Sequence, residues 1–127
     1  MNVQVIDREL ERLEDLWADG LSDAYRFYLD ALETFDADAQ PKLALAAALI
    51  EVGLRLQGLG GTAAPAPVLL MGDLCLARAS RLLADAASLH VQVAFARAIE
   101  EMASSAASGL AGRPVRELLL HAFEPAP

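Results

Sequence analysis

The chain has 127 residues, of which 55% are hydrophobic, and this length predicts one domain with a sizeable core. Its net charge of −8 argues against nucleic acid as a partner, because a surface of that charge repels phosphates. The negative excess is confined to residues 1–40, so within the single domain 1–127 we expect an acidic N-terminal helical hairpin over 1–40 and an apolar helical body over 41–123.

The acidic N-terminal third predicts two helices. A first helix is expected over residues 3–18 and ends near Gly20. Its apolar stripe consists of Ile6, Leu10, Leu13 and Trp17. A second helix is expected over residues 23–35, with Ser22 as its N-cap. Its apolar stripe consists of Leu21, Tyr25, Tyr28, Leu29 and Leu32.

Residues 41–56 predict a helix that other parts of a protein surround. Pro41 suits the first turn of a helix, where its missing N–H costs little. From Leu43 to Leu56 the segment is apolar almost all round, and only Glu51 and Arg55 are charged. A helix without a polar face is expected to lie inside a bundle.

Three further helices are expected after this segment. The Gly- and Pro-rich residues 57–67 predict a loop, and helices are expected over 68–87, 89–107 and 114–123. The inward-facing residues of the middle one are Phe95, Ile99 and Met102. Since no segment alternates as a strand does, the sequence predicts an all-α fold, a single bundle of five or six helices.

Three features could suggest a site, and each has a plainer interpretation. The stretch 58–61 is glycine-rich but follows a helix and lacks lysine, so it is expected to be a connection rather than a phosphate site. Glu11 and Asp15 are spaced i, i+4, but no histidine lies in that half of the chain, so a solvated face is expected rather than a metal site. His90 and His121 belong to no catalytic arrangement and are expected at the surface.

Cysteine use and hydropathy bear on location. Cys75 is the only cysteine, which excludes an internal disulfide, and its apolar helix predicts a buried thiol. The N-terminal residues lack the basic start and hydrophobic block of a signal peptide. The longest apolar stretch, Leu43 to Ile50, is too short to span a membrane. We therefore expect a cytoplasmic protein without a transmembrane segment.

The segment from Leu69 to Leu83 carries the most specific motif, Gly72-Asp73 followed by Ala77-Arg78-Ala79. This segment resembles an inner helix of the trans-isoprenyl diphosphate synthases, the all-helical enzymes that build prenyl chains. Val93 to Met102 resembles the next helix of those enzymes. The resemblance extends from about Leu43 to Ala103 and implies a truncated isoprenoid-synthase-like bundle.

The aspartate-rich metal motif of those synthases has no counterpart here. Family spacing places its His-Asp-Asp near residues 60–62, which read Gly-Gly-Thr, and no Asp or His lies between Glu51 and Asp73. Ionisation of an allylic diphosphate needs Mg²⁺ held by several carboxylates. The resemblance therefore implies a small, non-catalytic subunit of a heterodimeric hexaprenyl or heptaprenyl diphosphate synthase. Such a subunit has no catalytic residue, metal site or cofactor of its own. It supports long-chain products for quinone side chains while its catalytic partner holds the Mg²⁺.

The resemblance also assigns roles to particular residues. Gly72 and Asp73 form a scaffold motif both by the resemblance and by the plainer interpretation of the residues, in which Gly72 permits close helix packing and Asp73 favours the helix N-terminus electrostatically. The helices expected over 68–87 and 89–107 would form the partner interface. Its residues would be Leu76, Ala79, Leu83, Phe95, Ile99 and Met102. The wall of the partner's product tunnel, or the support of that wall, would be Ala47, Ala48 and Leu54.

A second class of function stays open beside this one. The chain could be a homo-oligomeric helical interaction module unrelated to prenyl chemistry. Its apolar excess fits either class, because both cover apolar surface with a partner. A carrier of small ligands is disfavoured, since a core of Ala and Leu has few polar anchors.

Overall fold

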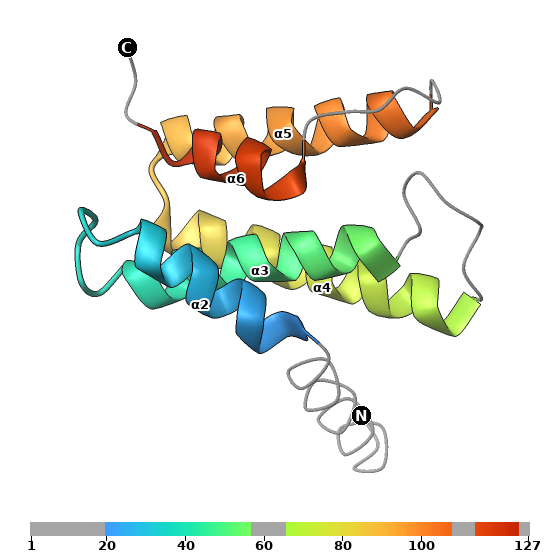
Figure 1. Ribbon diagram of the computed structural model, residues 1–127, viewed down its shortest axis with the longest axis horizontal. Helices are drawn as coiled ribbons and strands as arrows, with labels where there is room; N and C mark the ends of the chain where they lie inside the picture. Colours follow the sequence, from blue (N-terminus) through green and yellow to red (C-terminus); the bar gives the residue numbers. More distant parts are fainter. Residues whose placement is uncertain (1–19, 57–65, 108–113, 125–127) are drawn as a thin grey trace.

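The computed structural model describes residues 20–56, 66–107 and 114–124, and within these ranges the protein is all-α with no strand (Figure 1). The described helices are α2 (Ser22–Ala31), α3 (Gln40–Leu56), α4 (Ala66–Ala86), α5 (Leu89–Ala107) and α6 (Val115–Ala122). This confirms the predicted fold class. The helix expected over residues 3–18 lies outside the described residues, as do the predicted connections at 58–61 and the acidic pair Glu11 and Asp15.

The helices form two layers, one of α2, α3 and α4 and the other of α5 and α6 (Figure 1). The most extensive contact joins α3 to α4, and the next joins α2 to α3. The second layer meets the first through contacts of α6 with α3 and of α5 with α4. Helix α3 is therefore the element that touches most of the others.

Helix α3 is covered on nearly every side, as its composition predicted. Its buried residues are Leu43, Ala44, Ala46, Ala47, Ala48, Leu49, Ile50, Val52, Gly53 and Leu54. The many alanines matter because a small side chain lets neighbouring helices approach closely while still removing apolar surface from water. The charged residues Glu51 and Arg55 lie in the remaining, narrow strip.

Helices α3 and α4 pack closely where two glycines face each other. A Cβ atom on Gly53 would lie 3.1 Å from the carbonyl oxygen of Gly72, 3.1 Å from Cβ of Cys75 and 3.3 Å from Cγ of Leu76. Gly72 is buried at this crossing. Gly72, which was predicted to permit close helix packing, lies opposite Gly53 of α3 at this crossing.

Aromatic rings join the second layer to the segment that follows α2. Phe123, just after α6, packs edge-on against Phe95 of α5 with centroids 4.9 Å apart. The same ring packs edge-on against Phe35 at 5.8 Å. Such edge-to-face pairs contribute beyond their buried area. Phe95 and Phe123 are both buried, so the core runs continuously from the first layer into the second.

Three predicted details at helix ends are wrong. Ser22 is not an N-cap, because Leu21 precedes α2 in a helical conformation and no side chain caps the helix. Helix α2 ends at Ala31 rather than 35, since a turn begins at Leu32. Helix α4 begins at Ala66, which places Asp73 beyond the first turn. The helix dipole acts mainly within that first turn, so Asp73 does not serve the N-terminus.

Among the residues that the structure describes, no helix combines the length and the hydropathy that a membrane crossing requires.

Candidate functional site

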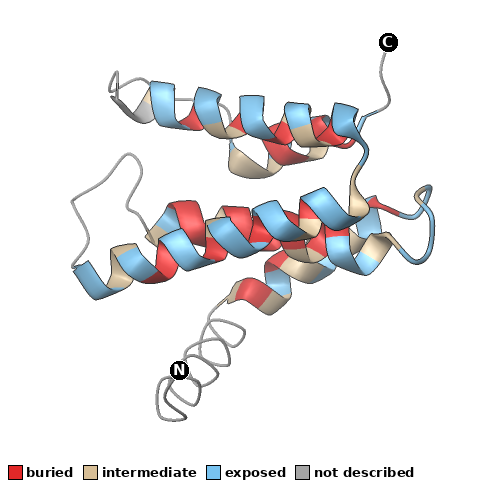
Figure 2. Cartoon of the chain, turned by 180° about the vertical axis from the view of Figure 1, so that it is seen from behind, coloured by how far each residue is buried: buried red, intermediate tan, exposed pale blue. Residues whose placement is uncertain are grey.

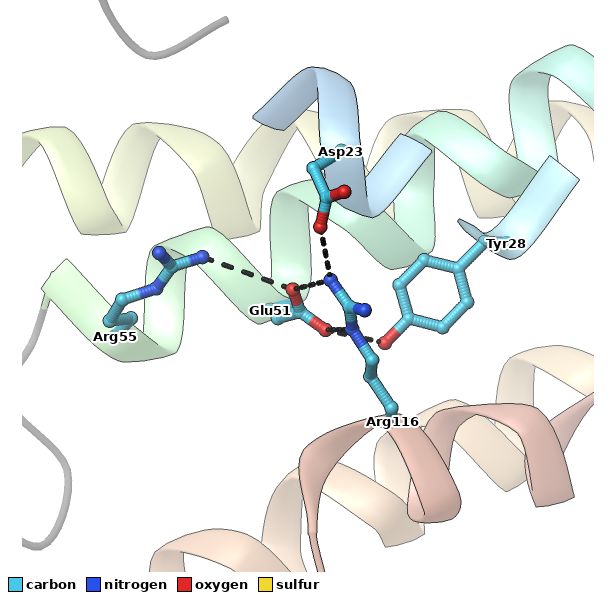
Figure 3. Close-up of polar contacts among 5 residues, drawn as sticks. All are labelled: Asp23, Tyr28, Glu51, Arg55 and Arg116. Carbon is cyan, nitrogen blue, oxygen red and sulfur yellow. Dashed lines mark hydrogen bonds and ion pairs between the residues drawn. The ribbon is translucent and has the colours of Figure 1, made fainter. Parts of the chain in front are cut away.

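A cluster of polar side chains surrounds Glu51 where α2, α3 and α6 meet (Figure 3). Arg116 of α6 donates from Nε to Oε1 of Glu51 at 2.9 Å and from Nη2 to Oε2 at 3.2 Å. The Tyr28 hydroxyl donates to the same Oε1 at 2.9 Å. Arg116 Nη2 also donates to Oδ2 of Asp23 at 3.0 Å, and Arg55 Nη2 lies 3.8 Å from Oε2 of Glu51.

The sequence places these groups by simple local rules. Glu51 and Arg55 are one helical turn apart on the strip of α3 that apolar neighbours leave open. Tyr28 is fully buried on α2 with its ring against that of Phe27, centroids 5.2 Å apart, so only its hydroxyl needs a polar partner. Arg116 is in the first turn of α6, and its guanidinium lies 4.5 Å from the ring centre of Phe27.

The electrostatics of the cluster favour the ion pair and a neutral phenol. Hydrogen bonds to Glu51 and Asp23 raise the pKa of Arg116 above its ordinary range, against a smaller opposing effect of burial. Burial, followed by the charge of Glu51 and the hydrogen bond to it, raises the pKa of Tyr28 far above its ordinary value, although Arg116 opposes the shift. The Tyr28 hydroxyl therefore remains a proton donor at any physiological pH.

This arrangement serves to hold helices together. Both carboxylate oxygens of Glu51 are occupied by donors of the chain itself, and its side chain is only 11% exposed. No buried side-chain nitrogen or oxygen in the described ranges lacks a hydrogen-bond partner. A carboxylate occupied in this way is suited to fixing α6 across α2 and α3.

In the sequence, Glu51 stands out as a charged residue of an apolar helix, whereas nothing singles out Arg116. The available signal was Glu51 itself, because a carboxylate in so apolar a helix needs a partner. Nothing local named that partner, which lies 65 residues away.

The residues predicted as a partner interface lie mostly inside this chain. Ala79, Leu83, Phe95 and Met102 are buried in its own core. Leu76 and Ile99 are half-buried and pack against that core. Any interface on α4 and α5 must therefore also use residues on their outer faces.

Four large apolar side chains are exposed on those outer faces. Leu70 and Leu74 of α4 are 55% and 43% exposed, and Leu89 and Val93 of α5 are 75% and 41% exposed. Each pair is spaced i, i+4, so each forms a ridge along its helix. Within the described residues, no other large apolar side chain is exposed.

The residues predicted to line or support a tunnel are core residues of α3. Ala47 and Ala48 are fully buried and Leu54 is 4% exposed. All three belong to the buried core of this chain.

The two histidines and the cysteine lie where the sequence predicted them. His90 and His121 are exposed, and His121 pairs with Glu124 at 3.0 Å. Cys75 is buried, and burial raises the pKa of its thiol, which keeps it protonated. The described residues contain no group of three or more His, Cys, Asp or Glu side chains placed to hold a metal ion.

Comparison of the chain with protein-family models, curated proteins and solved structures found no match.

Proposed function

We propose that this chain is a non-catalytic helical subunit that acts by binding protein through the outer faces of α4 and α5. The observation that carries the proposal is the exposure of Leu70, Leu74, Leu89 and Val93 on these two helices. Exposed apolar ridges of this kind are typical of protein interfaces. They lie on the two helices that carry the resemblance to prenyl synthases.

The partner we propose is an aspartate-rich, catalytic trans-prenyl diphosphate synthase subunit that makes long-chain products for quinone side chains. Two observations support this choice. Gly72 of the resembling motif is buried where α3 and α4 pack closely, which supports a scaffold role for it. The sequence between Val52 and Gly72 contains no carboxylate, so Mg²⁺ would be held by the partner.

The test is co-expression of a tagged chain with the long-chain prenyl synthase of the same organism. We expect the two to co-purify, and we expect the complex, but not this chain alone, to show Mg²⁺-dependent prenyl transfer. Leu74→Asp should abolish co-purification, because it buries a charge in the interface. Ala31→Asp, an exposed position on α2, is the matched control and should bind normally.

Two results would contradict the proposal. One is prenyl transfer by the chain alone that survives further purification. The other is co-purification that Leu74→Asp leaves unchanged, which would place the interface elsewhere.

A further inference from the structure

The connection between α4 and α5 consists of Ala87 and Ser88, and there the described chain passes from one layer to the other (Figure 2). Helical hydrogen bonds reach this bend from both sides. The N–H of Ala87 donates to the carbonyl oxygen of Leu83 at 2.8 Å, and that of Gln92 donates to the carbonyl oxygen of Ser88 at 3.0 Å. Residues 83–92 include neither glycine nor proline, so their sequence is compatible with one continuous helix.

Two side chains hold the bend in its bent form. The Ser88 hydroxyl oxygen accepts from the N–H of Val91 at 3.3 Å, and Nε2 of Gln92 donates to the carbonyl oxygen of Ala87 at 3.1 Å. A straight helix loses these contacts but supplies acceptors for the first N–H groups of α5, which have no partner within that helix. Because each hydrogen bond contributes little net free energy, the bent and straight forms are close in free energy.

The second layer holds together by its own contacts. The rings of Phe95 and Phe123 pack edge-on at 4.9 Å, and Nε2 of His90 lies 3.3 Å from the carbonyl oxygen of Glu124. Helix α5 contacts α6 more extensively than either helix contacts the first layer. The α5–α6 layer can therefore move as one piece when the bend changes.

The contacts that attach this layer to the first one do not depend on the bend. Arg116 donates to Glu51 and Asp23, and Phe123 packs against Phe35. The direct contact of α4 with α5 is slight beside that of α3 with α4. Each attachment can therefore form equally well between the layers of two different chains.

We propose that two copies of the chain exchange their α5–α6 layers by straightening this bend, so that Arg116 of each copy binds Glu51 of the other. Exchange keeps the contacts between the layers and changes only the bend, which makes it a low-cost route to a dimer. A connection of two residues favours exchange further, because it leaves the bent form little freedom to adjust. The Glu51 cluster of each copy is completed by the second copy in this dimer.

The exchange goes beyond the proposed function and is compatible with it. Each half of the dimer presents α4 of one chain beside α5 of the other, with the same outer faces. A chain that stays monomeric yet co-purifies with a prenyl synthase would overturn the exchange and leave the proposed function standing. An exchanged dimer that captures no synthase would do the reverse.

The first experiment alters the bend in the full-length chain. The chain is unfolded in guanidinium and refolded at about 100 μM, where association competes with closure within one chain. We expect light scattering after size separation to show a monomer and a dimer. Ser88→Ala removes the cap that holds the bend and should raise the dimer fraction at least about twofold.

Leu89→Pro should abolish the dimer. Leu89 is the first residue of α5, where proline is tolerated in the bent form, whereas proline inside a continuous helix breaks it. Leu89→Ala is the matched control, because it removes the same side chain without restricting the backbone, and it should dimerise as the native chain does.

The second experiment identifies the chain that supplies residue 116. Arg116→Lys keeps the positive charge beside Glu51 and Asp23 and supplies an amine that a carbodiimide joins to a neighbouring carboxylate. Isotopically light and heavy chains of this variant are mixed, refolded and cross-linked, and the dimer is isolated. We expect links from position 116 to Glu51 or Asp23 to join light to heavy chains in the dimer, and to stay within one chain in the monomer.

Three results would overturn the exchange. One is a chain that refolds only as a monomer. Another is a folded Leu89→Pro variant that dimerises as readily as Leu89→Ala. The third is a dimer in which every link from position 116 stays within one chain, since the two copies would then pair without exchange. This third measurement decides the question even where Leu89→Pro fails to fold, because it keeps the native bend.

Discussion

Arg116 holds Glu51 with two parallel contacts, Nε to Oε1 at 2.9 Å and Nη2 to Oε2 at 3.2 Å. This forked geometry fixes the direction of the guanidinium as well as its distance. Because Arg116 lies in the first turn of α6 and Glu51 in the C-terminal half of α3, the pair sets how the second layer of the fold sits on the first. The aromatic contact of Phe123 with Phe35 acts at the other end of α6.

Loss of Arg116 is expected to reduce the free energy of unfolding more than loss of an exposed ion pair does. Arg116→Ala should lower the free energy of unfolding by about 1–3 kcal/mol, since it leaves a carboxylate that is only 11% exposed with fewer donors. Lys42→Ala breaks the ion pair with Asp85, whose side chains are 49% and 63% exposed, and should cost at most about 1 kcal/mol. Denaturant unfolding of both variants checks the difference, and equal losses would contradict a structural role for the Glu51 cluster.

The buried phenol of Tyr28 should make stability fall at alkaline pH. Its pKa is raised in the folded protein, so above its ordinary value near 10 the unfolded chain loses the proton and the folded chain keeps it. The stabilisation is therefore fully present below about pH 10 and declines as the pH rises further. We expect Tm to fall more steeply in the native protein than in Tyr28→Phe between about pH 9 and 11. Parallel curves for the two proteins would show that Tyr28 does not carry the effect.

Gly53→Ala should destabilise the fold although alanine favours helices. A gain of about 1 kcal/mol in helix propensity is expected from this change. The new Cβ would lie 3.1 Å from the carbonyl oxygen of Gly72, a backbone atom that cannot turn aside as a flexible side chain can. We expect a net loss of about 1–3 kcal/mol from separating α3 and α4. A thermal unfolding midpoint equal to or above that of the native protein would show that the two helices can separate at little cost.

Ala47→Phe tests whether α3 acts as core or also as part of a tunnel. Ala47 is fully buried in this chain, so the added ring should cost about 1–3 kcal/mol of stability. Leu45→Phe, at a half-buried position of the same helix, is the control and should cost less. In a complex with a prenyl synthase that still assembles, a change in product length caused by Ala47→Phe alone would support a role of α3 at the tunnel. Unchanged products would limit Ala47 to packing.

The helices themselves could be predicted from the sequence because their periodicity is local. The expected range 89–107 coincides with α5. The segment from Leu43 to Leu56 is apolar on almost every side, and this predicted the central place of α3. The ends of the helices were predicted less accurately, for a physical reason. Ser22 is a good capping residue, but the chain before it already turns helically at Leu21, so no cap is needed there.

What only the tertiary structure decided is which neighbour each apolar face meets. Periodicity marks Phe95 and Met102 as inward-facing, but it cannot tell a face covered by the same chain from one covered by another, because both remove the same surface from water. The pairing of Glu51 with Arg116 likewise depends on α6 crossing α2 and α3, and no local rule connects residues 65 positions apart. The sequence by itself determined an all-α chain with a buried central helix. Folding then enclosed four of the six expected interface residues and left Leu70, Leu74, Leu89 and Val93 on the surface, because only one side of α4 and α5 can face the core.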